Sequence, residues 1–202
     1  MNVFILIGII IFCIYLFLHI KFLFKVNNDY DILQSNNPNK ENFEKIMNQK
    51  SPSVFTNISN QWNLKDLNKN NIDSHFKYYL SPILLNKKYE ILSNKLPKKN
   101  KLIMEKKNRH LILQLEGESK FYLFNPNQSK YLYNKKGISQ IDYWNQDLKK
   151  FPLLNKAQFV EIILHPHQML YIPRKWWYVS EQSENSKYID CNSDSLFSYF
   201  FI

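Results

Sequence analysis

The second half of the chain is a series of short apolar segments. From residue 101 on, large apolar and aromatic side chains recur with a period of two, and Pro, Asn or charged residues bound each segment. The segments read LIMEK, HLILQLEG, KFYLFNP, QFVEIILHP, QMLYIP, WWYVS and SLFSYFFI. Because no helical pattern separates them, they predict an all-β core, a sandwich or barrel of the jelly-roll kind.

The N-terminus is a long apolar run. No Asp, Glu, Lys or Arg falls between Val3 and Ile20, and about 20 apolar residues suffice for a helix that crosses a hydrocarbon core. A cleaved signal peptide would need a basic start and small residues at a cleavage site. This start is uncharged, and the following HIKFLFKV contains no small residue. Residues 1–25 are therefore predicted to be an uncleaved, single-pass transmembrane helix.

Two lysines indicate how this anchor is oriented. Lys21 and Lys25 flank its C-terminal side, and only the α-amino group flanks the other side. The positive-inside rule then predicts that the domain lies in the cytosol. Glycosylation sequons at Asn57 and Asn127 would matter only on the opposite side of the membrane.

The stretch between the anchor and the strands divides into a linker and a short helix. Residues 26–40 are polar and rich in Asn, and they predict a linker to a domain formed by residues 41–202. Residues 39–50 predict a helix, because Asn39 can cap it and three apolar side chains share one face. Residues 75–92 are aromatic and fit either a strand or a helix.

The chain is strongly basic, but its charge is dispersed. The formal net charge is +10, which favours nucleic acid or an anionic membrane surface as a partner. The lysines, however, are scattered as pairs, and only two arginines occur, Arg109 and Arg174. Arginine is the better reader of phosphates and bases. Nucleic acid is therefore not expected as a partner, whereas the membrane and a protein or small-molecule ligand are.

Three stretches of the chain carry a family pattern. Residues 117–133 (GESKFYLFNPNQSKYLY) and residues 138–180, which end in LYIPRKWWYVS, resemble consecutive segments of the JmjC and cupin-like 2-oxoglutarate oxygenases. Residues 42–62 resemble the opening helix and Pro-Val-Phe strand of that family. The resemblance covers about residues 36–202. It implies a double-stranded β-helix, the cupin-type jelly-roll barrel, with short flanking helices.

The same resemblance implies an iron site. In the family, a His-x-Asp on one strand and a distal His on another bind Fe(II) and leave positions open for 2-oxoglutarate and oxygen. Counting back from Gly117 puts the first two ligand positions on Met104 and Lys106, and sliding by one residue gives Ile103 and Glu105. No register yields His-x-Asp or His-x-Glu. An ammonium repels Fe(II), and a thioether is a poor ligand for it.

The remaining positions of the implied site depart as well. The distal histidine falls on Tyr178, whose phenol favours ferric iron. The cosubstrate lysine often sits two residues after the glycine, where this chain has Ser119. Lys120 comes one residue later and would lie on the opposite face of a strand. The expectation is a degenerate site with no catalytic residue, no metal and no cofactor.

One alternative ligand set remains. Glu105, His110 and Tyr178 can be combined into an improvised site for Fe(II) and 2-oxoglutarate, which would make the protein a hydroxylase or demethylase-type dioxygenase with rearranged ligands. His165 and His167 also share a face on a strand. No third ligand is evident for them, and both are expected at the rim of the barrel.

Four further side chains are candidates for lining a barrel cavity: Lys120, Tyr122, Trp176 and Trp177. The two tryptophans are also expected as core packing, since the barrel needs large apolar side chains. The function expected from the sequence is a membrane-anchored, cupin-like binding or scaffold module without catalytic activity. The dioxygenase with rearranged ligands is the alternative.

Overall fold

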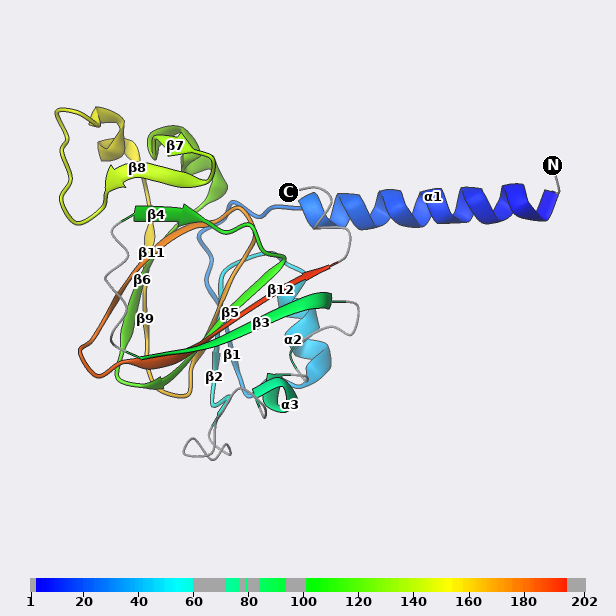
Figure 1. The fold of residues 1–202 in the computed structure, drawn as a ribbon, viewed down its shortest axis with the longest axis horizontal. Helices are drawn as coiled ribbons and strands as arrows, with labels where there is room; N and C mark the ends of the chain where they lie inside the picture. Colours follow the sequence, from blue (N-terminus) through cyan, green and yellow to red (C-terminus); the bar gives the residue numbers. More distant parts are fainter. Residues whose placement is uncertain (1–2, 60–71, 77–78, 80–83, 94–100, 196–202) are drawn as a thin grey trace.

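The computed structural model describes most of the chain (Figure 1). The described residues are 3–59, 72–76, 79, 84–93 and 101–195. The last predicted strand, SLFSYFFI, lies outside the described residues except for its first residue.

The core consists of two six-stranded sheets. The first contains, in spatial order, β1 (Leu33–Asn36), β2 (Ser53–Thr56), β10 (Met169–Ile172), β5 (Arg109–Glu116), β12 (Lys187–Ser195) and β3 (Leu84–Ser93). The second contains β7 (Asn134–Lys135), β8 (Ile138–Asp142), β4 (Lys101–Met104), β11 (Trp177–Gln182), β6 (Ser119–Phe124) and β9 (Val160–Leu164). All described pairings are antiparallel except that of β1 with β2. Two antiparallel-rich sheets of this kind are typical of a cupin jelly roll, and they confirm the predicted all-β core.

The side chains alternate between the inside and the outside of the barrel. Leu170 and Ile172 of β10 meet Phe121 and Leu123 of β6 in one buried cluster, so this cluster joins the two facing sheets. Tyr171, between the two β10 residues, belongs to a different cluster on the outer side. The period of two in the sequence therefore reflects strands whose side chains alternate between the inside of the barrel and an outer face that is also buried.

Two helices cover the outer face of the first sheet (Figure 1). They are α2 (Lys40–Met47) and α3 (Ile72–Phe76). Phe43 and Met47 of α2 and Phe76 of α3 pack against the outward side chains of β5 and β10. The predicted cap is present, because the Asn42 N–H donates to Asn39 Oδ1 at 2.8 Å. The helix predicted for residues 39–50 is thus confirmed, with its described end at Met47.

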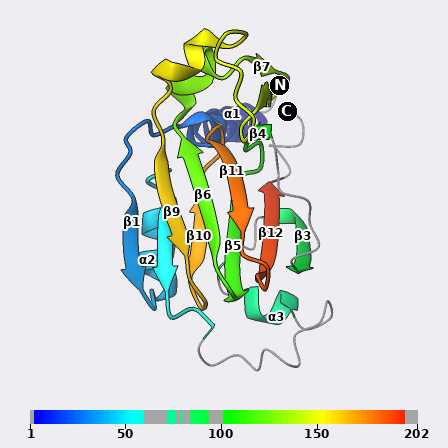
Figure 2. The ribbon, with the colours of Figure 1, turned by 90° about the vertical axis from the view of Figure 1, so that its left-hand side faces the viewer.

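The lobe between β6 and β9 adds two strands to the second sheet and packs on its outer face. It contains β7, β8 and two 3₁₀ helices, η2 (Pro126–Tyr131) and η3 (Pro152–Lys156), and it forms the upper part of the molecule in Figure 2. Ile141 and Leu154 of this lobe pack on Phe124, Trp177 and Val179 of the sheet.

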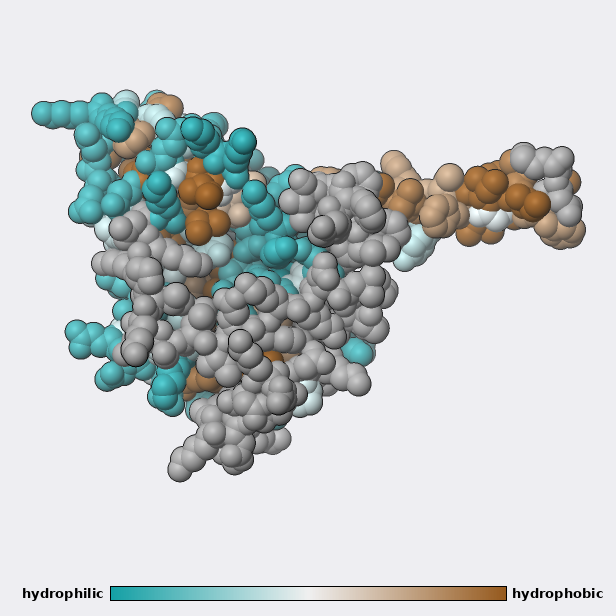
Figure 3. All heavy atoms as spheres, in the orientation of Figure 1, coloured by the Kyte–Doolittle hydropathy of each residue, from teal (hydrophilic) through white to brown (hydrophobic). Residues whose placement is uncertain are grey.

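The N-terminal helix α1 (Val3–Phe24) projects from the barrel (Figures 1 and 3). None of the span Val3–Lys21 is buried, and it is long and apolar enough to cross a membrane. A membrane anchor and a signal sequence both have these properties.

The segment predicted as a linker belongs partly to the domain. The Trp176 indole N–H donates to the Asn27 carbonyl at 3.1 Å, and the Asn125 side chain donates to the Asn28 carbonyl at 2.7 Å. The segment then continues into β1, which pairs with β2. An edge strand of mixed polarity and a run of polar groups satisfied by the barrel resemble a solvated linker in sequence. The sequence therefore predicts a domain that begins at residue 41, whereas the first strand of the sheet begins at Leu33.

The turn between β5 and β6 generates a stability prediction. Gly117 has a left-handed φ of +67°, and a Cβ there would meet Ser183 Oγ at 2.8 Å and the Asn185 carbonyl at 2.9 Å. Gly117→Ala is expected to lower the free energy of unfolding by about 1–3 kcal/mol. Urea unfolding of the full-length protein in non-ionic detergent, followed by tryptophan fluorescence, measures this. Gly8→Ala is the control, since nothing lies within 4 Å of its added Cβ; equal midpoints for the two variants would contradict the prediction.

Candidate functional site

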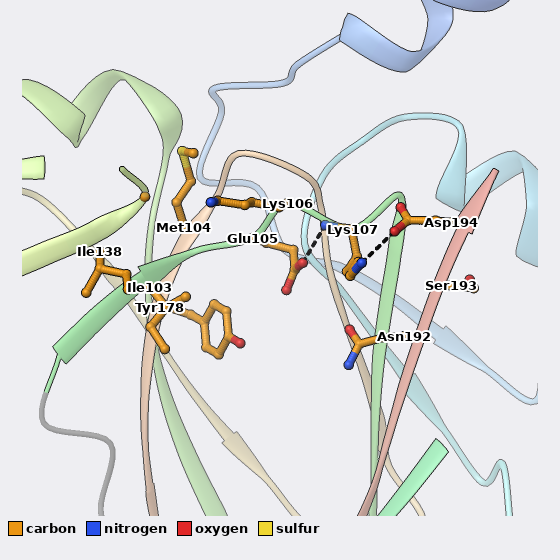
Figure 4. A pocket seen from close by; sticks show the side chains of 11 residues that line it. Ile103, Met104, Glu105, Lys106, Lys107, Ile138, Tyr178, Asn192, Ser193 and Asp194 are labelled. Carbon is orange, nitrogen blue, oxygen red and sulfur yellow. Dashed lines mark hydrogen bonds and ion pairs between the residues drawn. The ribbon is translucent and has the colours of Figure 1, made fainter. Parts of the chain in front are cut away.

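One end of the barrel opens into a pocket of about 580 Å³ (Figure 4). Its walls come from β4, the loop after β4, the start of β11, the end of β12 and the β7–β8 turn. Met104, Lys106 and Tyr178, the positions that the family resemblance assigned to iron ligands, all border it together with Glu105. The pocket therefore lies where the sequence placed the degenerate site.

Two backbone contacts fix the wall that carries Glu105. β4 pairs with β11, with Met104 opposite Trp177. Beyond the strand, the Glu105 N–H donates to the Trp176 carbonyl, and the Lys175 N–H donates to the Glu105 carbonyl, both at 2.7 Å. The loop after β4 is thus held against the β10–β11 turn (residues 173–176).

The face of β4 differs from the first register considered in the sequence. Ile103 packs against the interior cluster, and the buried Glu105 side chain also points inward. Met104 packs against the outer cluster, and Met104 and Lys106 both lie against Gly137, where an added Cβ would meet Lys106 Cε at 2.8 Å. Ile103 and Glu105, rather than Met104 and Lys106, therefore occupy the inward positions. A slip of one residue exchanges the faces of a strand, which the sequence could not settle.

A buried ion-pair cluster of Glu105, His110 and Asp190 lies behind the pocket. His110 Nδ1 is 2.5 Å from Glu105 Oε2, and His110 Nε2 is 3.1 Å from Asp190 Oδ1. Both contacts have the distances of ion pairs, but their angles are not those of straight hydrogen bonds. The side chains of His110, Glu105 and Asp190 are 1%, 6% and 14% exposed, so solvent screens these charges little.

The cluster holds a proton on His110. Burial by itself lowers the pKa of His110, but the charges of Glu105 and Asp190 outweigh it and raise the pKa to about 10. The imidazole is therefore a cation at neutral pH, which balances part of the charge of the two carboxylates. A protonated imidazole has no lone pair for a metal.

Tyr178 lies beside this cluster. Its ring contacts the His110 ring edge-on, with centroids 5.4 Å apart. Burial, together with the negative charges of Glu105 and Asp190, raises the pKa of Tyr178 well above its ordinary value. The phenol therefore stays protonated at neutral pH and is not available as a phenolate ligand.

Neither ligand set suggested by the sequence fits ferrous iron as arranged here. Ile103 offers no donor atom, and Met104 and Lys106 lie on the other face of β4. The alternative set is brought together, but Glu105 is occupied by His110 and by the Lys107 N–H at 2.6 Å. Within the described part of the chain, no three His, Cys, Asp or Glu side chains are arranged to hold a metal ion.

The position that the family resemblance assigns to the cosubstrate lysine carries Ser119 instead. Ser119 is buried, donates to Gln114 Oε1 at 2.7 Å and contacts Ser186 Oγ at 3.1 Å. Lys120 lies on the outer face of β6, where its ammonium is 3.3 Å from Glu161. β6 therefore directs no ammonium into the barrel.

The four cavity candidates lie elsewhere than the main pocket. Trp176 and Trp177 are fully buried packing residues, and the Trp177 indole N–H donates to Ser129 Oγ at 2.7 Å. Tyr122 packs in an outer aromatic group with Tyr143, and Lys120 borders a separate surface pocket of about 390 Å³. Lys120, Tyr122 and Trp177 point outward, as the alternation along β6 and β11 requires, whereas Trp176 packs in the interior cluster. None of the four borders the main pocket, so the prediction that they line it is corrected.

The histidine pair lies away from the pocket. His165 and His167 lie in the β9–β10 turn, at the end of β10 opposite to His110. His165 Nδ1 is 2.9 Å from Glu118 Oε1, and His167 Nδ1 is 2.9 Å from Ser59 Oγ. The two rings serve separate local contacts, in agreement with the expected place at the rim.

Sequence reasoning missed Asp190. It lies on β12 between Ile189 and Cys191, which both belong to the outer cluster. The alternation in KYIDCNSD therefore assigns the acidic side chain to the interior, and an acidic residue at an inward position was the signal available.

Comparisons with known proteins agree with the family resemblance. Residues 106–201 match the cupin-like domain family. The chain is 35% identical over 79 residues to human HSPB1-associated protein 1, 36% over 76 residues to human tRNA wybutosine-synthesizing protein 5, and 35% over 75 residues to JmjC domain-containing protein D of Dictyostelium discoideum. These matches cover 36%, 36% and 34% of this chain, but only 16%, 24% and 17% of the relatives. The chain therefore carries a cupin-like domain related to the JmjC proteins.

Proposed function

We propose that this protein is a membrane-anchored binding or scaffold module whose cupin-like barrel does not carry out iron and 2-oxoglutarate chemistry. One observation supports this above the others. The inward positions that correspond to the family's histidines carry Ile103 and Tyr178, while the adjacent carboxylate, Glu105, is ion-paired with His110. The groups that would hold a metal are replaced or already engaged.

The retained pocket supports a binding role. Its volume of about 580 Å³ is within the range of small-molecule sites. Its lining combines apolar side chains, such as Ile103 and Ile138, with the ammonium of Lys106 and the amide of Asn192. Such a mixture suits a ligand with both an apolar part and polar groups.

The anchor rests on α1. The helix is exposed along its length and can cross a membrane, and Lys21 lies in its last turn. A positive charge on the domain side supports a cytosolic location of the barrel.

A second candidate function is an Fe(II)- and 2-oxoglutarate-dependent oxygenase with rearranged ligands. Glu105, His110 and Tyr178 converge at one end of the barrel, and one relative is named a tRNA wybutosine-synthesizing protein. For this activity His110 would have to lose its proton and Glu105 would have to turn away from it.

Restoring the missing histidines distinguishes these two functions. In full-length protein purified in non-ionic detergent, we expect no stoichiometric Fe(II) binding by calorimetry and no conversion of 2-oxoglutarate to succinate. Ile103→His with Tyr178→His is expected to raise Fe(II) affinity by more than about 100-fold, because even outer-shell changes shift metal affinity by about 10- to 100-fold.

The matched control introduces ligands on the other face of β4. Met104→His with Lys106→Asp should raise the Fe(II) affinity much less than the first pair does, because these side chains border the pocket from the outer face of β4, against Gly137. If the wild-type protein binds one Fe(II) and forms succinate, and His110→Asn abolishes both, the oxygenase is the correct function.

The ion-pair cluster generates a prediction about pH. The pKa of His110 is higher in the folded chain, about 10, than its ordinary 6.5, so its stabilising contribution is complete below pH 6.5 and is lost as the pH rises toward 10. Within that window the wild-type free energy of unfolding should fall by up to about 1.4 kcal/mol per pH unit relative to Glu105→Gln/His110→Gln. Urea unfolding at several pH values measures the difference. Parallel profiles for these two proteins would refute it, and His165→Gln, at the exposed rim, should follow the wild type.

A further inference from the structure

The rim of the barrel next to α1 carries a group of cations. Phe24, the last residue of α1, lies under two of them, with Arg174 Cζ at 5.5 Å and Lys175 Nζ at 5.3 Å from its ring centroid. Lys21 lies three residues before Phe24, on the same side of the helix, and Lys25 follows it; both are exposed. We call Lys21, Lys25, Arg174 and Lys175 the juxtamembrane cation cluster.

This cluster is held in place by the barrel. Lys175 has a left-handed φ of 71° in the β10–β11 turn, and its N–H donates to the Glu105 carbonyl. Asn27, three residues after Phe24, accepts a hydrogen bond from the Trp176 indole and donates to Ser51 Oγ at 2.6 Å. The chain that leaves α1 is thus tied to the same turn that carries the two cations.

Arg174 is not satisfied by the barrel. Its Nη1 atom is buried, and no hydrogen-bond acceptor reaches it among the described residues. The carboxylates whose charge it senses, Asp194 and Glu105, are paired with Lys107 and His110 respectively. A buried guanidinium N–H without an acceptor is costly. Because the Arg174 side chain as a whole is only partly buried, a rotation of its guanidinium brings this N–H to an external anion, which would supply the acceptor.

The charges of Lys25 and Arg174 both act on the neighbouring side chain of Lys50. Lys50 is buried, and its pKa is lowered to about 8, first by burial and then by the charges of Arg109, Lys25 and Arg174. Lys25 from the end of α1 and Arg174 from the barrel therefore contribute to one positive potential.

We propose that the juxtamembrane cation cluster binds the anionic headgroup of a phospholipid at the surface where α1 enters the bilayer. This inference rests on the membrane anchor proposed above. The guanidinium of Arg174 can pair with a phosphate through two N–H groups, and basic groups beside a membrane helix attract anionic lipids. The pocket lies next to this surface, because Glu105 both borders the pocket and pairs with the β10–β11 turn.

Native mass spectrometry of the full-length protein tests this inference. The protein is reconstituted into vesicles of phosphatidylcholine and phosphatidylserine in about a 4:1 ratio, which mimics an anionic leaflet, and is released with non-ionic detergent. The expected result is an intact chain that carries phosphatidylserine adducts in excess over phosphatidylcholine. Arg174→Gln with Lys175→Gln should reduce the adduct ratio by about 25-fold, since each cation near the surface contributes about fivefold.

Two matched variants separate charge from folding and from net charge. Arg174→Lys with Lys175→Arg keeps both charges and should keep most of the adducts. Lys149→Gln with Lys150→Gln removes the same charge from the loop before η3, on the side of the domain away from α1 (Figure 1), and should change nothing.

Each other outcome overturns the proposal. Equal adducts in the wild type and Arg174→Gln/Lys175→Gln would show that the cluster is not the site. Displacement of the lipid by inorganic phosphate beyond that by chloride at equal ionic strength would indicate a site for free phosphate. An intact chain without adducts would refute the headgroup site and leave the anchor standing, whereas a chain that lacks α1 would refute both.

Discussion

Two backbone hydrogen bonds between Glu105 and the β10–β11 turn link the buried His110 cluster and the pocket to the cations beside α1. On one side of this contact, the Glu105 side chain reaches into the barrel and pairs with His110. On the other side, the turn presents Arg174 and Lys175 to the end of α1. Because the pairing is made by the backbone, it does not depend on which side chains occupy the loop. The barrel end, the pocket and the rim beside α1 are therefore joined in one corner of the domain.

A proton on His110 balances part of the negative charge in the interior of this corner. Two carboxylates buried in a barrel need a positive charge nearby, since an uncompensated buried charge is costly. The family resemblance assigns that charge to Fe(II); here the protonated imidazole of His110 supplies it. This balance supports the proposal that the barrel persists without its iron, because the charged groups stabilise one another. It also explains why Tyr178 remains a neutral phenol beside them.

Much of the architecture could be predicted from the sequence, for reasons that are local. The period of two along HLILQLEG and KFYLFNP reflects side chains that alternate between two buried faces, and Asn39 caps α2 through its own side chain. The predicted linker is different, because its polar groups are satisfied by Trp176 and Asn125, which are far away in the sequence. Asp190 was missed for a related reason: its partner, His110, lies on another strand.

The amino-acid sequence by itself determined that no histidine occupies the expected ligand positions in any register, and that an apolar helix precedes a β barrel. Residue identity and spacing suffice for both conclusions. Only the tertiary structure decided that Ile103 and Glu105, not Met104 and Lys106, face the interior, because the face of a strand depends on its pairing with β11 and β8. It also decided that Arg174 and Lys175 meet the end of α1, about 150 residues earlier in the chain, since contacts over such a separation arise only when the barrel closes.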